Sequence, residues 1–314
     1  MAFSLHSLLR WLPPYRALEQ EHRRGRAALA AAERQLAAWS RFFPPGHCYS
    51  PLPSDEEIAR AFARGGFGPP FPGVDLNEAG QQARLERLAA FHAEQPFPEE
   101  PMPGRRFHLN NNSYAHYDAI MLYSMLREAQ PRRVIEIGSG FSSAAMLDAD
   151  EHALGGRIHF TFIDPDPSRL RPLLGPGDLA RCTLIARCVQ DVPLATFQAL
   201  EENDVLFIDS SHVSKIGSDV NWIFFQLLPV LAPGVLIHFH DITGILEYPQ
   251  AWIEGGRAWN EQYLLRAFLM HNSAYRIELF TSWLLNTRPA WFAAHLPQCR
   301  PDGGGQLWLR KLAR

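Results

Sequence analysis

The stretch that decides the fold is residues 134–143, which read VIEIGSGFSS. Its valine and isoleucines favour a short strand that stops at the glycines. Gly138 and Gly140 permit positive φ angles and leave room for a close approach to the backbone. Helical spacing follows, and Ser142 or Ser143 is expected to cap that helix. A strand, glycine turn and helix direct free N–H groups at a ligand, although an ordinary tight turn explains the glycines equally well.

The composition limits the class of protein. The chain has 314 residues, 46% hydrophobic, with a formal charge of −3. It has room for one α/β domain with an appendage, and its charge favours neither nucleic acid nor an acidic membrane as partner. No apolar run approaches the roughly 20 residues of a membrane span. Four scattered cysteines without a CxxC pair predict a reduced, cytoplasmic protein without disulfides or a zinc cluster.

The N-terminal third differs from the rest. Residues 15–41 are rich in Ala, Glu and Arg and predict a helix that either pairs with another copy or packs on the body. Residues 42–105 are dense in proline and aromatics, which indicates an ordered cap rather than a linker. We therefore predict a helical, Pro-rich cap or arm over 1–105, a main domain over 106–314, and a possible route to a homodimer through the N-terminal region.

From residue 106 onward, predicted strands and helices alternate. Five strand segments are continuous apolar runs: RRVIEIG, RIHFTFID, CTLIARCV, DVLFID and GVLIHFHD. Such runs are typical of a parallel sheet covered on both faces. Two further segments, YRIELFTSWLL and GGQLWLRKL, predict a C-terminal antiparallel strand pair. The expected fold is α/β, a doubly wound, Rossmann-like sheet.

Acids and imidazoles stand at the ends of these strands. Ligands of doubly wound sheets lie outside the carboxyl ends of the strands. Asp164 lies 24 residues beyond Gly140, where this fold places an acid on ribose hydroxyls. The other strand ends carry Glu136, Asp191, Asp209 with His212, and His238, His240 and Asp241. One such acid is explained by helix capping, but five successive polar strand ends favour a cleft for a nucleoside.

The ordered set EIGSG, FIDP, VQDV, DVLFIDSSH and LLPVLAPGVLIHFHD resembles the class I S-adenosylmethionine-dependent methyltransferases over roughly residues 106–285. The likeness is greatest to the bacterial small-molecule O-methyltransferase group, which has sugar-modifying and hydroxylase-like members. The resemblance implies a cofactor site, with Glu136 at the amino-acid end, Asp164 on the ribose and Asp191 on the adenine amine. It also implies that the cofactor is bordered by Gly138, Gly140, Asp209, and Ser142 in place of a third glycine.

Methyl transfer to a hydroxyl needs a base or a metal that removes the proton. His240, at the end of the fifth strand, is the first candidate for the general base, and His212 and Asp241 are further catalytic candidates. His238 projects from the same strand face but deeper, so we expect a satisfied core histidine. Packing or capping remains the alternative for His240.

The resemblance also implies a metal. In metal-dependent relatives, acids at the ends of strands four and five hold a divalent cation, and Asp209 and Asp241 match those places. His240 replaces a frequent oxygen ligand, and with His212 nearby the set suits Mn or Fe(II) as well as Mg. After the fifth strand, residues 247–263 supply a wall for a sugar or another polar ring. Its candidate side chains are Trp252, Arg257, Trp259, Asn260 and Glu261.

The sequence therefore predicts a cytoplasmic methyltransferase that uses S-adenosylmethionine to methylate a hydroxyl of a small metabolite, with a saccharide as one candidate. Two alternatives stay open. A metal-dependent oxygenase or hydroxylase-like enzyme on the same fold would bind Fe or Mn and dispense with S-adenosylmethionine. A non-catalytic nucleoside-binding scaffold would bind its ligand without turnover.

Overall fold

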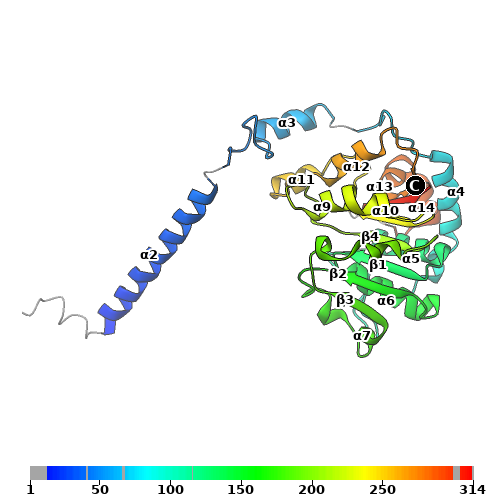
Figure 1. Cartoon of the computed structure of the whole chain (residues 1–314), viewed down its shortest axis with the longest axis horizontal. Coiled ribbons are helices and arrows are strands. Elements are labelled where there is room, and N and C mark those ends of the chain that lie inside the picture. Colours follow the sequence, from blue (N-terminus) through cyan, green and yellow to red (C-terminus); the bar gives the residue numbers. More distant parts are fainter. Residues whose placement is uncertain (1–12, 40–41, 66–67, 115, 300–304, 313–314) are drawn as a thin grey trace, which may run out of the picture. The chain divides into compact units, whose positions relative to one another are not determined.

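The computed structural model describes most of the chain, namely residues 13–39, 42–65, 68–114, 116–299 and 305–312. The chain divides into two compact units, residues 1–64 and residues 65–314 (Figure 1). The predicted boundary at residue 105 between a cap and the main domain stays a prediction.

The first unit contains two helices. α2 (Pro13–Trp39) begins earlier than the predicted residue 15, because a proline is compatible with the first turn of a helix. Leu18, Leu29 and Leu36 are exposed along it. The self-association predicted for this region stays a prediction. α3 (Asp55–Ala63) was not predicted from the sequence.

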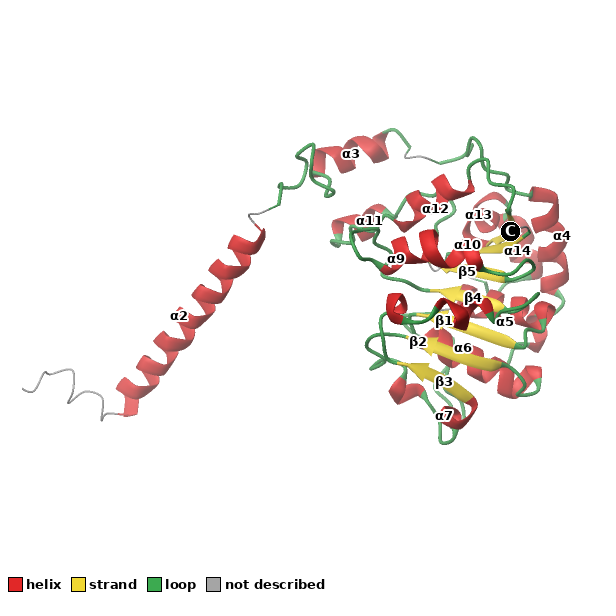
Figure 2. Cartoon of the chain, viewed as in Figure 1, coloured by secondary structure: helices red, strands yellow, loops and turns green. Residues whose placement is uncertain are grey.

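The second unit is built on one seven-stranded sheet in the order β3-β2-β1-β4-β5-β7-β6, flanked by helices (Figure 2). β1 to β5 pair in parallel, and β7 pairs antiparallel with both β5 and β6. The predicted doubly wound sheet with a C-terminal antiparallel pair is confirmed. The strands are β1 Arg133–Ile137, β2 His159–Ile163, β3 Cys182–Ile185, β4 Val205–Ile208, β5 Leu236–His240, β6 Tyr275–Phe280 and β7 Gln306–Lys311.

β6 is shorter than predicted. It ends at Phe280, and the following residues form α13 (Thr281–Thr287) rather than more strand. Thr281 Oγ1 accepts from the backbone N of Gln306 at 2.9 Å and donates to its carbonyl oxygen at 3.2 Å. The Thr281 side chain thus pairs with both backbone groups of Gln306, the first residue of β7. The backbone that follows Phe280 is therefore free to turn into a helix.

Further helices of the second unit flank the sheet. They are α4 Glu78–Ala89, α5 His116–Ala129, α6 Phe141–Ala149, α7 Asp178–Arg181, α8 Leu194–Gln198, α9 Asp219–Trp222, α10 Leu228–Val230, α11 Gln250–Glu254, α12 Glu261–Leu269 and α14 Pro289–His295. Ile223–Leu227 is a π-helical segment between α9 and α10. Arg171–Leu173 is a 3₁₀ turn, where a proline limits continuation. None of the described helices is long and apolar enough to cross a membrane.

α4 comes from the proline-rich segment yet packs against β6 and α5. Arg84 explains this attachment, because its guanidinium lies 2.7 Å from Glu128 on α5 and 2.6 Å from Glu278 on β6. Arg84 and Glu278 are both buried. Since an unpaired charge is costly to bury, this pairing ties α4 to the edge of the sheet.

Candidate functional site

The turn after β1 depends on one glycine. Gly138 has a φ of +80°. A Cβ atom there would lie 2.0 Å from the carbonyl oxygen of Asp209 at the end of β4. Gly140 has a φ of 174°, which is extended backbone, so only Gly138 uses the positive φ that both glycines permit. Gly138 therefore lets the turn pass directly over the end of β4.

We expect Gly138→Ala to lower the free energy of unfolding by about 3 to 5 kcal/mol, from left-handed strain and backbone overlap together. Gly177→Ala is the matched control, because Gly177 has a φ of +93° but open space around its Cβ position. The control should lose only about 1 to 2 kcal/mol. Urea unfolding of both variants measures the difference, and equal losses would contradict the close approach.

Glu136 lies under this turn rather than in the open. It is fully buried, and its Oε1 accepts from Ser142 Oγ at 2.5 Å while Oε2 accepts from Ser143 Oγ. The N-cap of α6 is Gly140, so the prediction that a serine caps this helix is wrong; Ser143 Oγ instead accepts from the Gly140 N–H at 3.0 Å. Burial raises the pKa of Glu136 to about 8, although the two serine hydroxyls oppose that rise.

The raised pKa of Glu136 predicts a pH dependence of stability. Between its ordinary value of 4.5 and about 8, the folded chain holds a proton that the unfolded chain has lost. As the pH rises through this window, this group alone should lower the free energy of unfolding by about 1.4 kcal/mol per pH unit. Glu136→Gln should remove that slope, since serine hydroxyls can donate to or accept from an amide. Chemical unfolding from pH 5 to 8 measures it, with exposed Glu254→Gln as control.

An unchanged slope in Glu136→Gln would contradict this account of Glu136. The control variant should retain the slope of the unmodified protein, because Glu254 lies on the surface.

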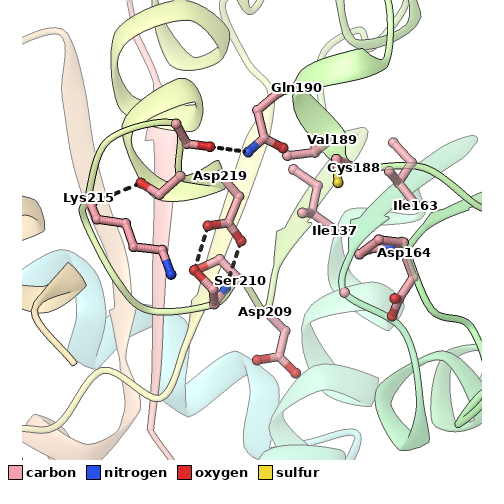
Figure 3. Close-up of a pocket in the computed structure, with 15 residues that line it drawn as sticks. Ile137, Ile163, Asp164, Cys188, Val189, Gln190, Asp209, Ser210, Lys215 and Asp219 are labelled. Carbon is pink, nitrogen blue, oxygen red and sulfur yellow. Dashed lines mark hydrogen bonds between the residues drawn. The ribbon is translucent and has the colours of Figure 1, made fainter. Parts of the chain in front are cut away.

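A cavity of about 410 Å³ opens at the carboxyl ends of β1 to β4 (Figure 3). Its lining is Ile137, Gly138, Ile163, Asp164, Pro165, Cys188, Val189, Gln190, Asp209, Ser210, Ser211, Lys215, Gly217, Ser218 and Asp219. Its volume lies in the range of about 300–1,000 Å³ that is typical of small-molecule sites. The sequence predicted a ligand cleft at this edge of the sheet.

Asp164 is held in place by backbone donors. Its Oδ2 accepts from the Ser139 N–H at 2.8 Å and from Ser139 Oγ at 3.1 Å, and its Oδ1 accepts from the Asp166 N–H at 2.8 Å. Oδ2 thus already accepts two hydrogen bonds, whereas Oδ1 accepts one and can accept a second. Asp164 therefore presents a carboxylate of fixed position, with one further acceptor site on Oδ1, at the wall of the cavity beside the glycine turn.

Asp191 does not line this cavity. It is exposed at the end of the 3₁₀ turn Val189–Asp191, and the cavity is lined there by Cys188, Val189 and Gln190. Successive side chains of a 3₁₀ turn point about 120° apart, so only part of the turn can face the cavity. Gln190 is fixed by donating to the Gly217 carbonyl oxygen at 2.8 Å. Sequence reasoning missed Gln190, since it searched for acids alone.

Three of the predicted residues meet at one end of the cavity. Asp209, His212 and Asp241 each offer one ligand atom, and these atoms lie within 4.8 Å of one another. His212 Nε2 lies 3.2 Å from Asp209 Oδ1 and 3.7 Å from Asp241 Oδ2. His212 and Asp241 both have positive φ angles, 58° and 57°, which are uncommon outside glycine. Such backbone conformations concentrate at functional sites.

His212 is buried between carboxylates. Burial alone would lower the pKa of His212, but hydrogen bonds to Asp209 and Glu261 raise it to about 10. Burial would likewise raise the pKa of Asp209, whereas His212 and the nearby His240 hold it below its usual value. In this state the protonated imidazole of His212 faces the ionised carboxylate of Asp209.

His238 and His240 lie on the same face of β5, with ring centroids 5.6 Å apart. Neither nitrogen of His238 has a hydrogen-bond partner among the residues that the structure describes, so the prediction of a satisfied core histidine is wrong; its ring stacks on Phe207 at 3.9 Å instead. Burial lowers the pKa of His238 well below its usual value. His240 is also buried, and its Nε2 lies 3.8 Å from Asp241 Oδ1.

Burial would lower the pKa of His240, but the carboxylates of Asp241, Asp209 and Asp118 raise it overall. Its Nδ1 has no hydrogen-bond partner in the described part of the chain. Tyr114 covers it, with ring centroids 5.1 Å apart. His240 thus lies in the wall of the cluster and is buried.

Residues 135–242 match a family model described as a methyltransferase domain. An uncharacterized protein from Archaeoglobus fulgidus is 34% identical over 170 residues, which make up 52% of this chain and 76% of that protein. The chain belongs to the class I S-adenosylmethionine-dependent methyltransferase family.

Solved structures similar to this chain include two methyltransferases. The S-adenosylhomocysteine-bound Podospora anserina methyltransferase PaMTH1 has a TM-score of 0.41 at 16% identity, over 83% of this chain and 98% of that chain. The O-methyltransferase TomG from Streptomyces achromogenes, in complex with S-adenosylmethionine, has a TM-score of 0.41 at 18% identity, over 73% of this chain and 90% of that chain.

Proposed function

We propose that this methyltransferase transfers the methyl group of S-adenosylmethionine to a hydroxyl oxygen of a small metabolite, with a divalent cation at the cluster of Asp209, His212 and Asp241. One observation carries the proposal. Asp209 lines the cavity and also belongs to the cluster. The reactive end of a ligand in the cavity would therefore meet an acceptor held at the cluster.

The cavity suits the cofactor in its chemistry. Asp164 supplies an anionic acceptor, the second site of Oδ1, for a hydroxyl donor of a ribose. The apolar side chains of Ile137, Ile163 and Val189 line the same space and suit the flat face of a purine. With the ribose at Asp164, the sulfonium end would extend toward Asp209, whose negative charge complements it.

The cluster suits a divalent cation. Oxygen and imidazole donors that each lie about 2.0–2.2 Å from one ion are within about 4.4 Å of each other. The three ligand atoms, which lie within 4.8 Å of one another, need only a small adjustment to meet this condition. A cation bound there would lower the pKa of a coordinated hydroxyl and orient its oxygen.

The chain's own residues then position the acceptor and take its proton. His240 is the proposed general base, since its Nε2 lies beside Asp241 and its burial excludes bulk water. Asp209 and Asp241 supply the two carboxylate oxygens of the cluster. Alignment of the acceptor oxygen with the methyl carbon is the main requirement of an in-line displacement.

The acceptor is proposed to carry a polar ring, with a saccharide as the first class to test. The Trp259 ring lies 4.3 Å from the His212 ring, and the Arg257 guanidinium lies 5.2 Å from the Trp252 ring and 5.4 Å from the Trp259 ring. Indole faces next to a cluster of polar groups offer stacking together with hydrogen bonding.

The test is a methyl-transfer assay with isotopically labelled S-adenosylmethionine and panels of sugars, phenols and hydroxy acids, each run with Mn²⁺, Mg²⁺ or EDTA. We expect S-adenosylhomocysteine to form with a labelled O-methyl product, and EDTA to suppress it. Transfer only to nitrogen or carbon would overturn the O-methyl assignment. Oxygen consumption with Fe²⁺ in the absence of S-adenosylmethionine would favour the oxygenase alternative.

A further inference from the structure

Glu261, at the start of α12, contacts the imidazole of the cluster from the side opposite the other carboxylates. Its Oε2 lies 2.8 Å from His212 Nδ1, whereas Asp209 lies on the Nε2 side at 3.2 Å. We infer that Glu261 is a positioning residue that fixes His212 as a nitrogen ligand, and that the site consequently prefers Mn²⁺ or Fe²⁺ to Mg²⁺. This inference rests on the proposed cation site.

The surroundings of Glu261 show that its position is fixed. It is 1% exposed, and its second oxygen, Oε1, accepts from Ser210 Oγ at 2.9 Å. Its backbone N–H donates to the His212 carbonyl oxygen at 3.1 Å. A carboxylate is costly to bury without partners, and here its two oxygens are satisfied by His212 and Ser210. The start of α12 is therefore tied to the turn that carries His212.

These contacts decide which nitrogen of His212 faces the cluster. A carboxylate acceptor at Nδ1 keeps a proton on that atom, which leaves the lone pair of Nε2 for an ion once the cluster binds one. Trp259 covers the ring at 4.3 Å, and the His212 N–H donates to Ser210 Oγ at 3.0 Å. Rotation of the ring would break the contact with Glu261, so the imidazole is held in one orientation.

The ligand set also determines which ions fit. Mg²⁺ prefers oxygen ligands and nearly ideal octahedral geometry, whereas imidazole nitrogen favours transition metals. A carboxylate behind the imidazole makes it a better donor. The set of Asp209, His212 and Asp241 supplies two oxygens and one nitrogen. We expect wild-type protein to bind Mn²⁺ at least about 10-fold more tightly than Mg²⁺.

The test compares Mn²⁺ binding to the full chain and to Glu261→Gln by electron paramagnetic resonance, without S-adenosylmethionine or acceptor. The substitution keeps the shape of the side chain and removes its charge. We expect the Kd for Mn²⁺ to rise about 10- to 100-fold, the preference over Mg²⁺ to shrink, and the ¹⁴N coupling of His212 to weaken. The thermal midpoint should change little.

Glu247→Gln is the matched control. Glu247 is also buried and lies before the same helix, but it contacts Tyr248 N at 3.0 Å and the Tyr263 hydroxyl. The Glu247→Gln variant should leave Mn²⁺ binding and the ¹⁴N coupling of His212 unchanged. Should Glu261→Gln fail to fold, Ser210→Ala removes one of the contacts of Glu261 and is expected to weaken Mn²⁺ binding by about 2- to 5-fold.

Several outcomes would overturn the inference. Unchanged Mn²⁺ affinity and ¹⁴N coupling in Glu261→Gln would refute the positioning role, as would an equal loss in Glu247→Gln. Wild-type protein that binds Mg²⁺ as tightly as Mn²⁺ would refute the metal preference. The proposed methyl transfer fails separately, in the assay of labelled product, because the Mn²⁺ titration requires no turnover.

Discussion

Asp164→Ala is expected to weaken S-adenosylmethionine binding by about 10- to 10²-fold, because a hydrogen bond to a charged group contributes about 1.5–3 kcal/mol. Asp164 lines the cavity, and its position is set by donors from Ser139 and Asp166. Because the carboxylate is already fixed, binding of a ribose to it costs the conformational freedom of the ligand but little from the protein. Isothermal titration calorimetry with S-adenosylmethionine and S-adenosylhomocysteine measures the change.

The control for this prediction is Asp166→Ala. Asp166 is an exposed carboxylate two residues further along, and it is absent from the lining of the cavity. It should change the Kd by less than about threefold, as a surface substitution does. Asp164→Asn separates charge from shape, since the amide keeps one acceptor; we expect an intermediate loss. Wild-type affinity in Asp164→Ala would place the ribose elsewhere and remove the main support for the proposed direction of the cofactor.

The arrangement of the sheet could be predicted from the sequence because parallel strands that are buried on both faces leave a plain signal. The runs around β1, β2, β4 and β5 are continuous and apolar, and in the structure each is buried over nearly its whole length. Strand alternation with helices then limits the topology to very few solutions. The C-terminal pair followed from two apolar segments without an intervening long helix.

The ends of elements were less predictable, because side chains distant in sequence decide them. β6 stops where Thr281 bonds to both backbone groups of Gln306, a contact between residues 25 positions apart. α4 lies among prolines and is held by Arg84 against Glu128 and Glu278. Local propensity carries no information about such partners.

The same distinction applies to the site. The rule that ligands meet the carboxyl ends of strands brought Asp164, Asp209 and Asp241 to one edge. It did not show that Glu136, on the other face of the β1 pleat from Ile137, is enclosed by serine hydroxyls. It also treated Glu261 as part of a substrate wall, whereas its carboxylate lies behind His212. Side-chain direction in turns was the missing information.

His240→Ala is expected to lower kcat about 10²- to 10⁴-fold, which is the usual contribution of a positioned general base. The Kd values of S-adenosylmethionine and Mn²⁺ should stay within about threefold of wild type, because His240 belongs neither to the cavity lining nor to the three clustered ligands. Rapid-quench kinetics of a single turnover separates the chemical step from product release. This separation matters because a slow release step would conceal part of the loss in steady-state kcat.

His238→Leu is the matched control, since His238 occupies the same face of β5 and is fully buried. Its two nitrogens have no hydrogen-bond partners within the described ranges of the chain, so an apolar side chain of similar volume should preserve both stability and kcat. If His240→Ala kept kcat within threefold of wild type, the metal-held hydroxyl would need no protein base, and the role of His240 would reduce to packing against Tyr114. If both variants lost activity alike, the cause would lie in the packing of the ring side chains on this face of β5 rather than in proton transfer. Only a large loss confined to His240→Ala supports the proposed base.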